Sequence, residues 1–180
     1  MENPIIINLM RIMNVDCRID LETLHISHPK CTKLYRGRPE MLLMTMRNGR
    51  NVQMFRGGKV QILGCIPNDV AESMRNEVIM RLRKVYSMQL SQVTKMTITN
   101  MVVSARLRRK ICLRKIATSD VNLFHEIELF PAALIRKWHP VHIALFHNGK
   151  VILTGLKSVE QFYEIMSTLT SFLESCNIYE

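Results

Sequence analysis

The side chains with the clearest chemical potential occur in pairs, one member in each half of the 180-residue chain. The pairs, 91 or 92 residues apart, are Asn8 with Asn100, Phe55 with Phe146, Lys59 with Lys150, and Gly64 with Gly155. The last two pairs belong to a heptapeptide that occurs twice with small changes, as GKVQILG at 58–64 and GKVILTG at 149–155. Similarity at a fixed offset indicates a duplicated structural unit. We therefore expect two copies of one unit, each presenting an amide, an aromatic ring and an ammonium group.

The charge of the chain favours a polyanionic partner. Its formal net charge is +10, with a pI near 9.7. Lysine and arginine side chains placed along phosphates release condensed counterions, which favours binding to nucleic acid. The densest basic run is RLRRKICLRK at 106–115, which is either a solvated face or a contact surface.

Catalytic and metal-binding patterns are weak in this sequence. HEIE at 125–128 lacks the second histidine of a zinc-protease motif, and His25, His28 and Cys31 have loose ligand spacing without a fourth partner. The five cysteines are scattered and form no CxxC pair. We expect no enzyme activity, no metal and no cofactor.

The sequence also indicates a compartment. No apolar run approaches the roughly 18 residues of a membrane span. The N-terminal MENPIIINLM lacks the basic region and the cleavage site of a secretory signal. We expect an intracellular, reducing environment and no membrane partner.

The paired residues need strands and helices to position them, and each half offers the same series. An opening strand (5–13 or 96–106) precedes a short apolar-periodic stretch (20–27 or 110–119). Three strands follow, at 41–47, 51–55 and 59–64 in the first half and at 133–138, 141–146 and 150–155 in the second. A short linker near 88–94 separates the halves. We expect repeats at 1–90 and 91–180.

A long helix closes each half. In the first helix Pro67 suits the opening position, and the expected apolar stripe is Val70, Met74, Val78, Leu82 and Val85. In the second helix Ser158 and Gln161 form a capping box, and the expected stripe is Val159, Phe162, Met166, Leu169 and Leu173. Both stripes need a sheet beneath them. The other sheet face should stay open, with Lys59, Gln61, Leu63, Lys150, Ile152 and Thr154 along it.

Several stretches resemble one known family. They are NLFHEIELFPAALIRKWHP at 122–140, FHNGKVILTG at 146–155, ITNMVVSARL at 98–107 and DCRIDLETL at 16–24. In order and nearly in spacing, they are similar to the core of the TATA-box-binding protein family. The resemblance implies an α+β saddle, in which two pseudo-symmetric repeats form a curved, ten-stranded antiparallel sheet with helices on the convex face. The concave face would lie on the DNA minor groove.

The resemblance also implies roles for single residues. Asn8 and Asn100 would hydrogen-bond the central bases, with apolar contact from Met10 and Val102; A·T pairs present only acceptors in the minor groove, to which an amide can donate. Phe130, Phe146 and Phe55 would be wedges at base steps. Phosphate contact would come from Lys59, Lys150 and Arg136, and a base-edge contact from Thr154. Glu126, Glu128 and Leu129 match the stirrup that binds transcription factor IIB in the family.

The first repeat departs from the family pattern. The position of its second wedge holds Arg38 or Pro39, and Gln61 and Leu63 replace a valine and a threonine. We therefore expect an asymmetric saddle with relaxed TATA preference, in which the Asn100 half keeps the DNA chemistry and the Asn8 half has a weakened wedge and altered groove contacts. The alternative is that Arg38 enters a narrow minor groove, where negative potential favours a guanidinium.

Two hypotheses compete with a promoter-binding general transcription factor. One is a TBP-like adaptor or competitor that binds IIB-type proteins and little DNA; the other is a saddle acting on RNA, whose stiff A-form grooves suit phenylalanine wedges less well. The expected partners are double-stranded promoter DNA, a IIB-like protein, a IIA-like factor and RNA polymerase. The expected location is the nucleus, or a cytoplasmic viral transcription site if a virus encodes the chain.

Overall fold

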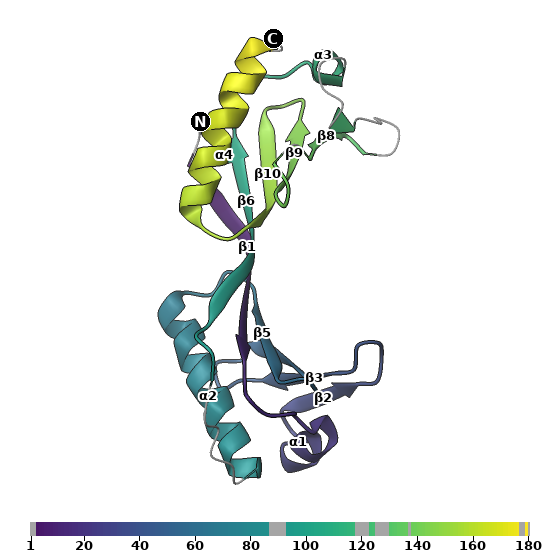
Figure 1. Ribbon diagram of the computed structural model, residues 1–180, viewed down its shortest axis with the longest axis vertical. Helices are drawn as coiled ribbons and strands as arrows, with labels where there is room; N and C mark the ends of the chain where they lie inside the picture. Colours follow the sequence, from purple (N-terminus) through teal and green to yellow (C-terminus); the bar gives the residue numbers. More distant parts are fainter. Residues whose placement is uncertain are drawn as a thin grey trace. The chain divides into compact units, whose positions relative to one another are not determined.

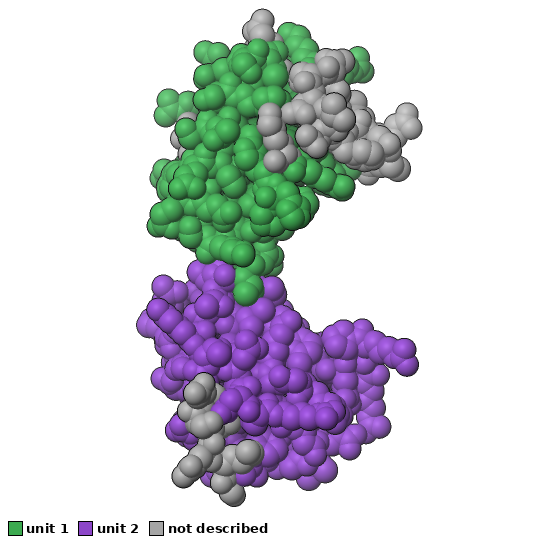
Figure 2. Space-filling view, viewed as in Figure 1, with its two compact units in different colours: residues 1–9, 99–180 green, residues 10–98 purple. Residues whose placement is uncertain are grey.

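A computed structural model describes residues 3–86, 93–117, 123–124, 130–136, 138–176 and 179. The chain divides into two compact units, which Figure 2 colours separately. Unit 1 contains residues 1–9 and 99–180, and unit 2 contains residues 10–98. The first strand therefore begins in unit 1 and ends in unit 2. Most of the expected linker at 88–94 lies outside the described residues, and the repeat boundaries at 1–90 and 91–180 stay a prediction.

The same series of elements occurs twice along the chain. The first is β1 (Ile5–Asn14), α1 (Leu21–Ser27), β2 (Thr32–Tyr35), β3 (Met41–Thr45), β4 (Asn51–Phe55), β5 (Lys59–Leu63) and α2 (Asn68–Tyr86). The second is β6 (Thr97–Arg106), α3 (Leu113–Ala117), β7 (Leu123–Phe124), β8 (Ala132–Ile135), β9 (His142–Phe146), β10 (Lys150–Leu156) and α4 (Val159–Ser175). The strand order is β2-β3-β4-β5-β1-β6-β10-β9-β8-β7. The expectation from periodicity of three strands after each short helix was therefore incomplete, because β2 and β7 add a fourth at each edge.

Each unit buries one face of its strands under its long helix (Figure 1). In unit 2, alternate strand residues such as Leu42, Met54 and Val60 are buried in one cluster with Met74 and Val78 of α2. In unit 1, the strand residues Val103, Leu145 and Leu153 are buried, as are Phe162 and Leu169 of α4. In the strands whose side chains the structure describes, the alternate residues face away from the helix. We call this second surface the open face of each unit.

The predicted helix stripes are confirmed with one exception. Met74, Val78 and Leu82 of α2 are buried, and Val70 and Val85 pack against the same core. In α4 the stripe is Phe162, Ile165, Met166, Leu169 and Leu173, whereas Val159 is 41% exposed. The prediction that Val159 belongs to the buried stripe was wrong. Val159 is the first residue of α4, and it stays exposed at the end of the helix. None of the described helices is both long and apolar enough to cross a membrane.

The predicted N-caps form, with the difference that the Gln161 side chain reaches the residue before the cap, Lys157, and not Ser158 itself. Ser158 is the N-cap of α4 and accepts a hydrogen bond from the Gln161 backbone N–H (3.2 Å), while Gln161 Oε1 accepts from the Lys157 N–H (2.8 Å). Pro67 immediately precedes α2, and its carbonyl accepts from the Ala71 N–H (3.0 Å). These contacts satisfy backbone groups at the helix starts that would otherwise lack partners.

The repeated heptapeptide is explained by close backbone contact at its first glycine. Gly58 has φ +85°, and a Cβ placed there would lie 2.5 Å from the Val15 carbonyl oxygen. Gly149 has φ +80°, and its Cβ would lie 2.6 Å from the Arg109 carbonyl oxygen. Each glycine carbonyl accepts a hydrogen bond from the chain it approaches, from Val15 N–H (3.0 Å) or Leu107 N–H (2.8 Å). Both hairpin turns therefore need a residue without a side chain.

Gly58→Ala is expected to lower the free energy of unfolding by about 2 kcal/mol. Alanine is strained in the left-handed backbone conformation of this position, and its Cβ would clash with the Val15 carbonyl oxygen. Urea denaturation followed by circular dichroism measures the change. Gly57→Ala is the matched control, since a Cβ on Gly57 would meet no atom within 4 Å. Equal stability of the two variants would contradict the role assigned to Gly58.

Candidate nucleic-acid interface

The open faces carry most of the predicted contact residues. In unit 2 the strand register places Met10 opposite Leu63, Ile12 opposite Gln61, and Met41 opposite Phe55. In unit 1 it places Thr154 opposite Val102 and Ile152 opposite Ser104. Alternation along the strands puts the predicted residues Asn8, Met10, Phe55, Lys59, Gln61, Leu63, Asn100, Val102, Phe146, Lys150, Ile152 and Thr154 on these faces, opposite the buried core. Placement on a face agrees with the prediction, but contact with DNA stays a prediction.

The amide of Asn100 is held in one orientation. Its Oδ1 accepts a hydrogen bond from the Gly155 backbone N–H at 2.9 Å. The strand register shifts between Thr154 and Leu156, so Gly155 lies at a bulge and its N–H is available to this side chain. Because the oxygen is occupied, the Nδ2 group remains as the donor. No other hydrogen bond of the Asn100 side chain is formed among the described residues.

Asn8 lies in the same unit on the neighbouring strand β1 and is exposed. Its Oδ1 accepts from the following backbone N–H, that of Leu9, at 2.9 Å. The two predicted asparagines therefore share one arrangement, in which a backbone N–H holds the oxygen and the amino group is left to donate.

The predicted aromatic pair is formed in unit 1. The ring centroids of Phe130 and Phe146 lie 6.1 Å apart in an edge-to-face arrangement, and Phe130 is 43% exposed. The register of Ala132 with Phe146 places Phe130 beside this strand end. Lys150 lies over the same site, with its Nζ 5.9 Å from the Phe146 ring centroid. Rings exposed in this way can contact bases.

Unit 2 has half of this arrangement. Phe55 has Lys59 Nζ 5.3 Å from its ring centroid, as in the other unit. Met41 is opposite Phe55 as Ala132 is opposite Phe146, so Pro39 occupies the position of Phe130. The register thus chooses Pro39 over Arg38 as the replaced wedge. Arg38 is exposed beside it.

Two of the three predicted phosphate-binding cations, Lys59 and Lys150, lie beside these rings, whereas Arg136 follows the end of β8 away from Phe146. Lys59 and Arg136 are exposed, and Lys150 is half-buried. Arg106, from the basic run at 106–115, is the cross-strand partner of Lys150 and is exposed at the same rim. Arg106 was not predicted as a contact residue from the sequence, although its place in the basic run was a usable signal.

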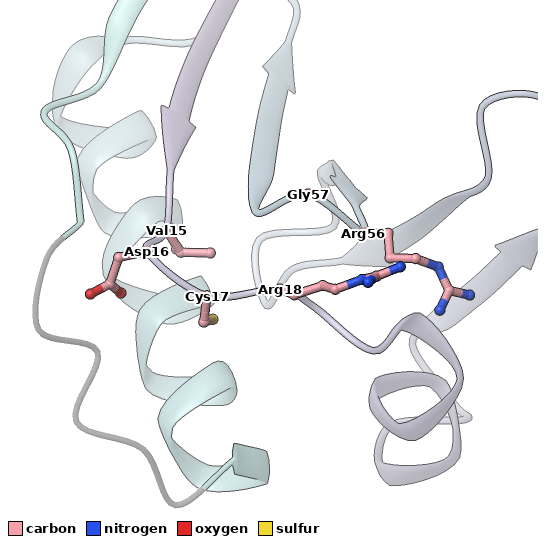
Figure 3. A pocket seen from close by; sticks show the side chains of 6 residues that line it. All are labelled: Val15, Asp16, Cys17, Arg18, Arg56 and Gly57. Carbon is pink, nitrogen blue, oxygen red and sulfur yellow. The ribbon is translucent and has the colours of Figure 1, made fainter.

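A pocket in unit 2 was not predicted from the sequence. It is lined by Val15, Asp16, Cys17, Arg18, Arg56 and Gly57. Figure 3 shows the Arg18 side chain extending toward Arg56. Arg56 Nη2 lies 2.6 Å from Glu40 Oε2, and the hydrogen bond and charge of Glu40 raise the pKa of Arg56. Burial, with a smaller effect of Asp16, raises the pKa of the Cys17 thiol. The pocket could not be predicted from a local sequence pattern, because Arg18 and Arg56 are 38 positions apart in the sequence.

The histidines considered as metal ligands have other neighbours. His25 Nδ1 lies 2.8 Å from Thr32 Oγ1, and Arg81 Nη1 donates to Cys31 Sγ at 2.9 Å. Within the described residues no group of three or more histidine, cysteine or acidic side chains is arranged to hold a metal ion. His125 and the predicted partner-binding residues Glu126, Glu128 and Leu129 lie outside the described residues.

These features define a duplicated α+β protein in which each unit buries one sheet face under its long helix and leaves the other face uncovered. A family model for "Transcription factor TFIID (or TATA-binding protein, TBP)" matches residues 3–85 and 95–176. The chain therefore belongs to the TATA-binding protein family, as its sequence motifs predicted, and the predicted α+β fold of that family is confirmed. The members are transcription factors, so the prediction that the chain is not an enzyme is confirmed by membership.

Individual relatives agree with this assignment. The chain is 27% identical to a TATA-box-binding protein of Emericella nidulans over 164 residues, covering 89% of this chain and 60% of the relative. It is 27% identical over 169 residues to that of Schizosaccharomyces pombe, covering 92% and 72%. The structure matches Methanococcus jannaschii TBP with a TM-score of 0.74 at 25% identity, covering 97% of this chain and 99% of the other. The chain thus spans less than two thirds of the Emericella protein.

Proposed function

We propose that this chain is a divergent TATA-box-binding general transcription factor that binds and bends promoter DNA through the minor groove. The observation that carries the proposal is the shared placement of the Asn100 amide and the Phe130–Phe146 pair on one open face. Family membership supports the same ligand. We place its action in the nucleus, with a cytoplasmic viral transcription site as the alternative for a virus-encoded protein.

The chemistry of the open face suits the minor groove of A·T-rich DNA. That groove presents acceptors at A N3 and T O2, to which the amino groups of Asn8 and Asn100 donate. Exposed rings wedge into base steps and kink the duplex, and Lys59, Lys150 and Arg136 contact phosphates. Val102 and Ile152 supply apolar contact between these polar groups.

The two units are expected to contribute unequally. Unit 2 has Pro39 where unit 1 has Phe130, and Leu63 where unit 1 has Thr154. A proline cannot stack into a base step as a benzyl ring does. We therefore propose that unit 1 supplies most of the bending and that TATA preference is relaxed relative to a protein with four wedges.

The proposal includes recruitment of a IIB-like protein. Its support is the resemblance of Glu126, Glu128 and Leu129 to the family's IIB-binding stirrup. A pull-down with a IIB homologue, comparing wild type with Glu126→Arg and Glu128→Arg, tests this step. Equal capture by all three proteins would remove the recruitment step while leaving DNA binding intact. Contact with a IIA-like factor and RNA polymerase belongs to the same proposal and is tested by assembly on promoter DNA.

Binding to a TATA duplex is expected to weaken steeply with salt. Three phosphate contacts alone give a slope of log K against log salt of about −3, because each neutralised phosphate releases counterions. Gel shift at several salt concentrations, with fluorescence energy transfer between the duplex ends for bending, measures both properties. Lys150→Ala should reduce the slope by about 1. Lys84→Ala, on α2, is the matched control and should leave the slope unchanged.

A different result would favour the adaptor hypothesis. The observation that favours the adaptor hypothesis is Pro39, which stands where unit 1 has the wedge Phe130. Absence of detectable binding to any TATA duplex at low salt, together with intact capture of a IIB homologue, would replace the promoter-binding proposal by an interaction factor.

A further inference from the structure

Two glutamine side chains lie next to each other on the open face of unit 2. Gln53 of β4 and Gln61 of β5 are register partners. Their row continues to Leu43 in one direction and Ile12 in the other. In unit 1 the corresponding register partners are Ala144 and Ile152, each 91 positions later. An apolar pair in unit 1 is therefore an amide pair in unit 2.

Neither amide is satisfied within its unit. Gln61 is only 9% exposed, and no hydrogen bond among the described residues involves the side chain of Gln53 or Gln61. The fully buried, unpartnered polar atoms of the described side chains are Arg11 Nη1, His28 Nδ1 and Arg75 Nε, so the Gln61 amide is still reachable from the open face. Water can reach the amide while the face is open, but a ligand that covers the face and offers no partner would leave the amide unpaired, which is costly. A ligand bound on this face would supply the missing partner.

The minor groove offers one group that distinguishes this pair from its apolar counterpart. A·T and T·A pairs present only acceptors there, whereas a G·C pair adds the guanine 2-amino donor. An apolar surface such as Ala144 and Ile152 leaves that amino group without an acceptor. A glutamine amide accepts from it through oxygen and donates to the neighbouring C O2 or G N3 through nitrogen.

We propose that Gln53 and Gln61 form a pair that accommodates the purine 2-amino group, so that the half-site facing unit 2 tolerates a G·C pair that the half-site facing unit 1 excludes. This inference rests on the proposed function, because it requires the open faces to contact the minor groove. It goes further in naming Gln53, a base-reading position that the sequence motifs did not single out, and in naming the chemical group that both amides read.

Inosine provides the test, because an inosine·C pair differs from G·C only in lacking the 2-amino group. TATA duplexes are prepared with G·C or inosine·C at one position, tiled along the site, or at the two symmetric positions together. A·T and T·A pairs present the same minor-groove acceptors, so the protein can bind the site in either orientation. It can therefore choose the orientation that places unit 2 on a single G·C pair. We expect equal Kd values for single G·C and single inosine·C at the reading position, and an about tenfold weaker Kd for double G·C than for double inosine·C.

The variants carry the residues of unit 1 at the same places. Gln53→Ala with Gln61→Ile should bind a single G·C duplex about tenfold more weakly than a single inosine·C duplex. If circular dichroism shows that the double variant is unfolded, the measurement is repeated with each single substitution. Asn51→Ala is the matched control, since Asn51 is an exposed amide on β4 whose Oδ1 already accepts from Thr45 Oγ1 (2.9 Å), and it should keep the wild-type ratio.

Two results would overturn this inference without affecting the proposed function. One is a tenfold preference of the wild type for single inosine·C over single G·C at every position. The other is a ratio of these two Kd values in the glutamine variants that equals the wild-type ratio. Failure of the wild type to bind even the unmodified TATA duplex would overturn the proposed function and this inference with it. The unmodified duplex thus separates the two failures.

Discussion

Replacement of Asn100 by aspartate is expected to weaken binding to a TATA duplex by at least about 100-fold, or roughly 3 kcal/mol, with little change in stability. The carboxylate keeps an oxygen that can accept from the Gly155 N–H, so the contact that holds the side chain survives. The amino group becomes a negatively charged oxygen facing the acceptors of the minor groove. Fluorescence anisotropy with a labelled duplex measures Kd, and urea denaturation measures stability.

The control for this substitution is Asn148→Asp in the β9–β10 turn. Asn148 Oδ1 also accepts from a backbone N–H, that of Lys150 at 3.0 Å, so the same charge is introduced with the same kind of local bond preserved. We expect a loss of less than about tenfold from general repulsion of phosphates. If both substitutions weaken binding equally, Asn100 contributes only charge, and its assignment as a base-reading donor is wrong.

Sequence reasoning succeeded where the signal is local. The order of strands and helices, the Ser158 cap and the α2 stripe each depend on residues within a few positions of one another. The repeat itself needed only a comparison of the two halves. Gly58 and Gly149 were located by the same comparison, although the reason for them, a carbonyl oxygen within 3 Å of the missing Cβ, is visible only in the fold.

It failed where the signal depends on pairing between distant segments. β2 has four residues and β7 has two, too short for alternation to show, and each is defined by its partner strand. The choice of Pro39 over Arg38 required the register of Met41 with Phe55. The Asn100–Gly155 bond required the bulge in β10, which the glycine at 155 is compatible with but which only the register with β6 defines.

The asymmetry of the two open faces therefore combines both kinds of information. The sequence alone identifies Gln61 and Leu63 as departures from the family pattern. The register adds Gln53 as the neighbour of Gln61 and shows that both correspond to apolar residues in unit 1. In the sequence, Gln61 looks like a single loss of a family residue. In the structure, it is one of two neighbouring glutamines that replace an apolar pair on the open face.

The double substitution Phe130→Ala with Phe146→Ala is expected to weaken binding to a TATA duplex by roughly 100-fold, since each stacked ring is worth about 1–3 kcal/mol. It should also reduce the bend. Unstacking a base step is known to cost about a few kcal/mol for minor-groove binders of this very family, which is a general value for the family and not a property measured on this chain. Without the wedges nothing offsets that cost, so the duplex stays straighter. Gel shift gives the affinity, and energy transfer between the duplex ends gives the bend.

Comparison with Phe55→Ala makes this prediction specific to the pair. Phe55 has no second ring beside it, because Pro39 takes that place, so its removal should cost only about tenfold and change the bend little. Tyr163→Ala is the control for loss of an exposed ring: Tyr163 is 51% exposed on α4, on the side of unit 1 opposite its open face, and should bind as wild type does. Equal losses from Phe55→Ala and from the double substitution would mean that the two units bend DNA alike, and the asymmetry inferred from Pro39 would be wrong.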